Sequence, residues 1–132
     1  MAEHYIPENL PTHIQHFING EFVDSINGAT FDVLDPVTNQ NYATAAAGQK
    51  EDIDAAVAAA REAFVNGPWP KMKPRERARI LNKIADAVEA QEERLAEMET
   101  FDTGLPTTQA KGQALRAAEN FRFFADLIVA QF

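Results

Sequence analysis

The hydrophobic pattern of this chain changes its period near residue 49. Before that point, short apolar stretches with partial alternation end at turn residues, which is the pattern of strands. FINGEFV carries Asn19-Gly20 between apolar ends, a hairpin signal, because both residues tolerate positive φ. TFDVLDP predicts a second strand that ends at a turn, and residues 42–47 predict a third, weaker one.

After residue 49 the apolar positions recur at the three- and four-residue steps of helices. The first predicted helix ends at Asn66-Gly67-Pro68, and the second opens at Pro74 and runs to about Phe101, with Gln91 as a polar gap. Gly104 can cap its end, and Thr107 can cap a third helix. The first helix presents Ile53, Val57, Ala60 and Phe64 on one face, and the buried stripe of the third is predicted to hold Ala110, Ala114, Ala117, Phe121, Phe124 and Ile128.

Residues 1–15, which are polar and contain two prolines, are predicted to form an extended arm before these elements, or else a frayed terminus. The third helix is still apolar at Leu127, Ile128 and Phe132 and shows no stop signal. We therefore expect a truncated chain, although a last helix that docks on its own domain would show the same pattern.

Charge and composition exclude several classes of function. The chain has 132 residues, 12 basic and 20 acidic, and a net charge of −8. Phosphate backbones and anionic membranes need positive charge, so we expect neither a nucleic-acid nor a membrane partner. The sequence has no cysteine, no secretory signal and no apolar run long enough to span a membrane, which is compatible with a cytoplasmic protein.

Few residues offer chemistry by themselves. The sequence lacks GxGxxG and phosphate-loop motifs, and its only serine is Ser25. His4, His13 and His16 lack metal-ligand spacing, so we expect them to be structural. A run of glutamates between residues 89 and 99 is predicted to be a solvated helix face. The basic run from Lys71 to Lys83 is read the same way, although positive charge at a helix N-terminus also hints at acidic neighbours outside this chain.

Asp102 and Arg116 are the two candidate site residues. Asp102 follows a predicted helix end, where free carbonyl groups and a carboxylate could hold a cation; a capping role is the alternative. Arg116 lies among small residues of the third helix and needs an anion, either a structural carboxylate or a ligand.

Several segments, taken in order, closely resemble the opening of an aldehyde dehydrogenase: FINGEFV, TFDVLDPVTNQ, DIDAAVAAAREAF, GPWPKMKPRERARILNKIADAVE and LAEMETFDTGLP. The resemblance covers about residues 16–130. Within the superfamily, DTGLP followed by RAAENFRFFAD looks most like the 5-carboxymethyl-2-hydroxymuconate semialdehyde dehydrogenases of aromatic catabolism. The 2-hydroxymuconate semialdehyde and betaine aldehyde enzymes are near neighbours.

The resemblance implies an α/β parent fold with a Rossmann-like cofactor domain, of which residues 16–132 would be the first part. It implies an oxidoreductase that uses NAD or NADP to oxidise an aldehyde, assembled as a homodimer or homotetramer. The family's cysteine nucleophile, general-base glutamate and oxyanion-binding asparagine would all lie downstream of this chain. We therefore expect the 132-residue chain alone to be inactive and assign it neither catalytic nor cofactor-binding residues.

Three positions and one arginine can be matched to the family's sites. A sodium or potassium ion is implied at the backbone oxygens of Val33 and Leu34 together with the carboxylate of Asp102. Arg116 matches an arginine placed to hold the substrate carboxylate in the muconate semialdehyde branch, although the alignment could slip by one residue there. A different aldehyde dehydrogenase, such as a betaine aldehyde enzyme, and a small helical binding module without activity are the alternatives.

Overall fold

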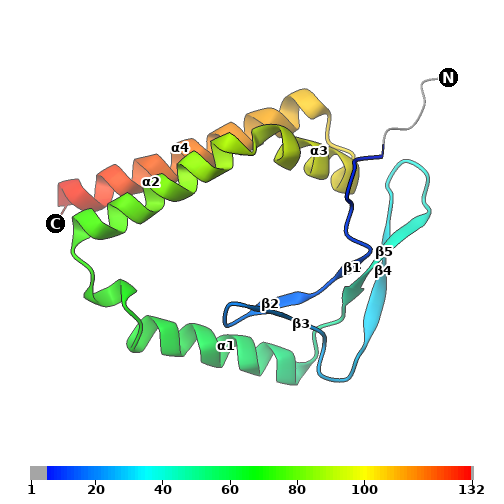
Figure 1. Ribbon diagram of the computed structural model, residues 1–132, viewed down its shortest axis with the longest axis horizontal. Helices are drawn as coiled ribbons and strands as arrows, with labels where there is room; N and C mark the ends of the chain where they lie inside the picture. Colours follow the sequence, from blue (N-terminus) through cyan, green and yellow to red (C-terminus); the bar gives the residue numbers. More distant parts are fainter. Residues whose placement is uncertain (1–5, 132) are drawn as a thin grey trace. The chain divides into compact units, whose positions relative to one another are not determined.

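The computed structural model describes residues 6–131 and divides the chain into two compact units (Figure 1). Residues 8–71 form a strand-rich unit, and residues 72–131 form a helical unit to which residues 6 and 7 also belong. Residues 1–5 of the predicted arm, His4 among them, and Phe132 lie outside the described residues.

Five short strands make two small sheets in the first unit. A three-stranded sheet has the order β1-β5-β4, with β1 (His13–Ile14) parallel and β4 (Thr30–Leu34) antiparallel to the central β5 (Asn41–Ala46). The two residues of β1 end the predicted extended arm, so that part of the arm is paired in the sheet. Strands β2 (His16–Ile18) and β3 (Glu21–Val23) form the second sheet.

The hairpin predicted from FINGEFV is present between β2 and β3. Its two turn residues, Asn19 and Gly20, have φ of 54° and 85°, the positive values that the turn signal required. Phe17 and Phe22 are cross-strand partners with ring centroids 5.0 Å apart, and both are exposed.

Helix α1 (Lys50–Val65) follows the central strand, and a short 3-10 helix, η1 (Trp69–Lys71), comes after the predicted stop at residues 66–68. The predicted apolar face of α1 is exposed, with Ile53, Val57 and Phe64 each more than half accessible. Asp52 is the buried residue of this helix. The helix is confirmed, but its own unit does not cover its apolar face.

The helical unit contains α2 (Pro74–Ala90), α3 (Glu92–Thr103) and α4 (Thr107–Gln131). The single helix predicted from Pro74 to about Phe101 is therefore wrong, because the backbone leaves helical geometry at Gln91, with φ −118° and ψ 19°. Gly104 ends α3 with φ 76°, and its N–H donates to the Thr100 carbonyl, which confirms the predicted left-handed cap.

Alanines form the core of the helical unit. Ala85, Ala96, Ala118 and Ala125 are completely buried, and Ala110 is 1% exposed. Small side chains let helices approach closely, which excludes bulkier neighbours from the centre of the contact. The burial predicted for Phe124 is wrong for this reason: its ring is 54% exposed, and the neighbouring Ala125 occupies the buried position.

Candidate functional site

The four site residues predicted from the sequence are divided between the two units, two in each. Val33 and Leu34 lie at the end of β4 in the strand unit, where the pairing with β5 shifts register. Asp102 lies in the last turn of α3, and Arg116 lies on α4, both in the helical unit. The three predicted cation-ligand positions therefore belong to two different units.

Around Asp102, the chain satisfies several of its own helix-end groups. The Thr103 hydroxyl donates a hydrogen bond to the Glu99 carbonyl at 2.7 Å. The Gly104 N–H donates to the Thr100 carbonyl at 2.9 Å. Leu105 N–H in turn donates to the Thr103 hydroxyl at 3.2 Å. Asp102 itself is exposed. Over residues 6–131, no three histidine or carboxylate side chains gather as a metal site would require.

Arg116 is exposed on α4 and has a neutral partner. Its Nη2 donates to Oε1 of Gln113, one turn earlier on the same helix. Within the described part of the chain it makes no salt bridge, so the structural carboxylate that was one of its two predicted partners is not found there. A guanidinium fork with only an amide neighbour retains the capacity to bind a carboxylate by two hydrogen bonds.

Arg122, one and a half turns further along α4, has the carboxylate partners that Arg116 lacks. Its two terminal nitrogens donate to both oxygens of Glu89 at 2.6 and 2.8 Å, and Nη2 also reaches Asp86 at 2.9 Å. Hydrogen bonding to Glu89, with the nearby Asp86 charge, raises the pKa of Arg122. The residue ties α4 to α2 and was missed by sequence reasoning, which treated Glu89 as part of a solvated face.

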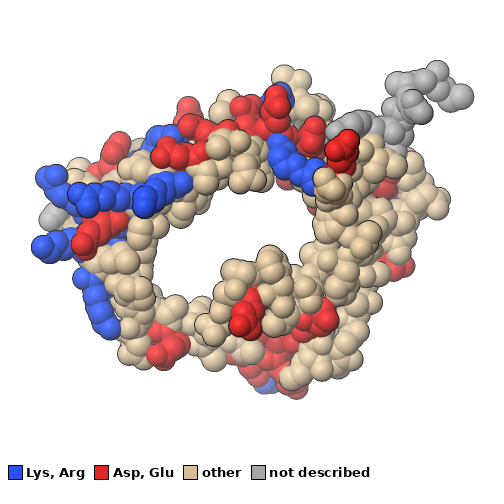
Figure 2. All heavy atoms as spheres, in the orientation of Figure 1, with Lys and Arg blue, Asp and Glu red and all other residues tan. Residues whose placement is uncertain are grey.

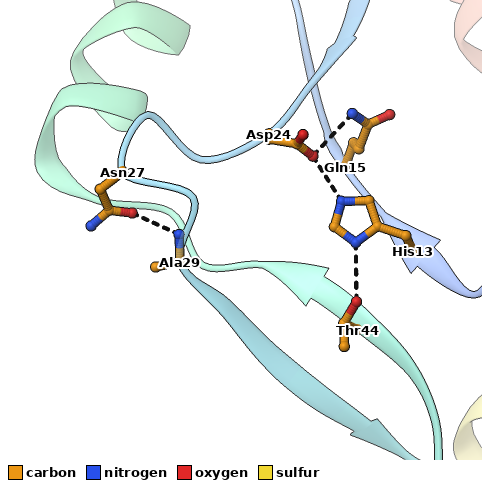
Figure 3. Close-up of polar contacts among 6 residues, drawn as sticks. All are labelled: His13, Gln15, Asp24, Asn27, Ala29 and Thr44. Carbon is orange, nitrogen blue, oxygen red and sulfur yellow. Dashed lines mark hydrogen bonds and ion pairs between the residues drawn. The ribbon is translucent and has the colours of Figure 1, made fainter.

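A polar network around His13 links three segments of the strand unit (Figure 3). His13 contacts the Thr44 hydroxyl through Nδ1 at 3.0 Å and the Asp24 carboxylate through Nε2 at 2.7 Å, and Gln15 donates to the same carboxylate at 3.0 Å. These bonds lower the pKa of Asp24, with His13 contributing most. The imidazole and the carboxylate are 42% and 59% exposed. Water therefore competes for these groups, and we assign the network a structural role.

Asp52 is the buried centre of a second network. Its carboxylate accepts hydrogen bonds from the N–H of Gln49 at 2.8 Å, the N–H of Ile26 at 2.9 Å and the Ser25 hydroxyl at 2.9 Å. The bond from Gln49 contributes most to lowering the pKa of Asp52, and those from Ile26 and Ser25 add to it. Ser25, the only serine of the chain, is thus buried and anchors a loop to the start of α1.

The model of the aldehyde dehydrogenase family matches residues 22–131. The chain therefore belongs to the aldehyde dehydrogenase family, a family of oxidoreductases, and corresponds to its N-terminal region. This confirms the family that the order of segments indicated, together with the expected α/β parent fold.

Individual relatives agree with this assignment. The chain is 50% identical over 110 residues to aldehyde dehydrogenase 1 of Tanacetum cinerariifolium, covering 83% of this chain and 22% of that protein. It is 44% identical over 116 residues to the 2-hydroxymuconic semialdehyde dehydrogenase of a Pseudomonas species, covering 87% of this chain and 24% of the relative. The chain thus spans less than a quarter of the length of either protein.

Solved structures show the same correspondence. An NAD-dependent aldehyde dehydrogenase from Sinorhizobium meliloti superposes with a TM-score of 0.82 at 35% identity, over 89% of this chain and 24% of that one. HpcC from Thermus thermophilus gives a TM-score of 0.80 at 44% identity, over 89% of this chain and 22% of that one.

Among residues 6–131, no helix is both long and apolar enough to cross a membrane.

Proposed function

We propose that this chain is the first part, residues 16–132, of the cofactor domain of an NAD(P)-dependent dehydrogenase that oxidises a carboxylated, muconate-type semialdehyde to the acid. Use of NAD(P) is supported by the family and by similarity to an NAD+ complex of the Bacillus cereus enzyme, at 45% identity and a TM-score of 0.81. We also infer that the complete enzyme is cytoplasmic, forms a homodimer or homotetramer, and acts in aromatic catabolism.

The observation that carries this substrate class is the state of Arg116. The guanidinium is exposed, contacts only Gln113 among the described residues and makes no salt bridge there. A carboxylate on the substrate would supply the missing anion and fix the aldehyde end relative to the nucleophile of the complete enzyme. The similarity to a 2-hydroxymuconic semialdehyde dehydrogenase supports the same class.

Replacing Arg116 with alanine in the complete enzyme tests the proposal. Because a charge-assisted hydrogen bond contributes about 1.5–3 kcal/mol, kcat/KM for a carboxylated semialdehyde should fall roughly 10- to 100-fold. A neutral aldehyde of the same length should lose little. Arg116→Lys should recover only part of the loss, because an ammonium cannot form the two-pronged contact.

Arg61→Ala is the matched control, since it removes an exposed positive charge from α1 without touching α4. It should leave both substrates nearly unaffected. Equal losses on charged and neutral aldehydes in Arg116→Ala would contradict the anchoring role. A gain for a cationic aldehyde alone would favour the betaine aldehyde class, whose Staphylococcus aureus structures match at 34% identity and a TM-score of 0.82.

We further propose that the complete enzyme binds sodium or potassium through the backbone oxygens of Val33 and Leu34 and the carboxylate of Asp102. Support comes from the exposed carboxylate at the end of α3 and from the irregular pairing at Val33 and Leu34, where the strand leaves its regular ladder. Hard oxygen donors of this kind suit such cations.

Activity or thermal stability of the complete enzyme should rise when sodium or potassium replaces a bulky organic cation at constant ionic strength. Asp102→Ala should abolish that response, because it removes the charged ligand, whereas Asp126→Ala on α4 should preserve it. An unchanged response in Asp102→Ala would contradict the cation site and favour a helix-capping role.

A further inference from the structure

The basic residues of this acidic chain are concentrated in one short segment. Half of the 12 lysines and arginines lie within residues 71–83, and Glu76 is the one acidic residue in that span. Figure 2 shows lysine and arginine atoms gathered over the end of the helical unit where α2 begins. The six basic residues are Lys71, Lys73, Arg75, Arg77, Arg79 and Lys83.

Part of this segment lines a half-open surface cavity of about 480 Å³ in the helical unit. The first two turns of α2 supply most of its wall, and Val129 near the end of α4 supplies an apolar side. The volume suits a small ligand, since binding pockets for small molecules begin at roughly 300 Å³. The lining residues are Lys73, Pro74, Arg75, Glu76, Arg79 and Val129.

Some basic residues of the described chain are held in ion pairs, and the three cations of the cavity are not. Lys50, Lys111 and Arg122 each lie within 4 Å of a carboxylate. No salt bridge to any described residue is formed by Lys73, Arg75 or Arg79.

Glu76, the carboxylate of the cavity, already has a structural task. Its carboxylate accepts a hydrogen bond from the Lys73 N–H at 2.8 Å and so caps the start of α2. The positive character of the cavity therefore comes from side chains and does not depend on free amides at the helix end. Three positive charges and one negative charge leave a net charge of +2 in the lining.

We propose that this cavity binds a small dianion with an apolar portion, specifically a phosphate monoester. A net charge of +2 matches a phosphate monoester above its second pKa of about 6. Guanidinium groups at Arg75 and Arg79 lie one turn apart and can share the phosphate oxygens, while Pro74 and Val129 contact the ester group. The site is distinct from Arg116, because the 13 residues from Arg116 to Val129 extend about 20 Å along α4.

Titration calorimetry of the complete enzyme with inorganic phosphate and with phenyl phosphate tests the proposal at mildly alkaline pH. Both should bind saturably, with phenyl phosphate tighter because its ring buries apolar surface. Arg75→Gln and Arg79→Gln should each weaken binding by about tenfold, the loss of one charge-assisted contact. Both side chains are exposed, so circular dichroism should show unchanged helix content.

Lys83→Gln is the matched control, because it removes the same charge one turn further along α2, outside the cavity lining. It should change affinity by no more than about twofold. Absence of saturable binding would overturn the proposal, as would equal weakening in all three variants. Tight binding of a glutamate-rich peptide without binding of phenyl phosphate would also overturn it and assign the segment to an acidic protein surface.

Discussion

At the scale of single residues, partners decide which polar side chains are structural. Ser25, Asp52 and Arg122 are bound to other segments of their own unit, while Arg116 and the cations at the start of α2 are not paired with carboxylates among the described residues. Sequence reasoning identified Arg116 as needing an anion but could not find Arg122, because Asp86 and Glu89 lie more than 30 residues before it. Such pairing depends on how α2 and α4 pack.

Two aspartates make the strand unit sensitive to acid. Hydrogen bonds lower the pKa of Asp24 and of Asp52 below the usual aspartate value of 3.8. Because the folded state holds these protons less tightly than the unfolded state, their contribution to stability is fully present above pH 3.8 and is lost as the pH falls through the lowered values. Thermal melts recorded between pH 6 and pH 2 should show this loss, a range set roughly by the ordinary aspartate pKa.

Asp52→Asn should flatten that acid dependence and lower the melting temperature by about 5 °C or more at neutral pH, since the amide cannot accept all three hydrogen bonds. Asp54→Asn is the control, because Asp54 is exposed and contacts only Lys50 one turn away. The same melting temperature in both variants would show that the buried network adds no stability.

At the scale of elements, the periodic signals predicted α1, α4 and the β2–β3 hairpin, but not the break between α2 and α3. Apolar positions continue at helical spacing on both sides of Gln91, so the local pattern fits one helix. Both α2 and α3 contact α4, and these contacts between distant segments are not visible in the local pattern. Strand β1 was not predicted, because two residues are too short to show an alternating hydrophobic pattern. Its pairing partner β5 lies about 30 residues away.

Replacing two glycines of the helical unit by alanine should change the free energy of unfolding in opposite directions. Gly104 has φ 76°, so Gly104→Ala should cost about 1 kcal/mol of unfolding free energy. Gly112 lies inside α4, and a Cβ added there meets open space, so Gly112→Ala should add about 0.5–1 kcal/mol. Urea denaturation measures both. Stabilisation by Gly104→Ala would contradict the left-handed cap.

At the scale of the whole molecule, the chain spans about a quarter of its aldehyde dehydrogenase relatives and contributes no cysteine. Helix α1 keeps Ile53, Val57 and Phe64 exposed, so the strand unit itself does not cover this apolar face. The order of segments made the family predictable, because the spacing of several weak motifs is specific when combined. The relative placement of Val33, Leu34 and Asp102 could not be predicted, since they belong to different units.

The 132-residue chain mixed with NAD+ and a semialdehyde should produce no NADH, because the cysteine nucleophile that the family resemblance implies is absent from this sequence. The matching control is the complete enzyme under the same conditions. Turnover by the short chain, retained after removal of contaminating enzyme, would contradict the assignment of the chemistry to other parts of the protein.

The proposed preference for carboxylated semialdehydes is tested most directly by the rate of NADH formation. The complete enzyme is given a carboxylated semialdehyde and, separately, a neutral aldehyde of equal length. With Arg116 available to the substrate carboxylate, kcat/KM should be at least about tenfold higher for the carboxylated substrate. Equal kcat/KM values, or a preference for the neutral aldehyde, would contradict the account.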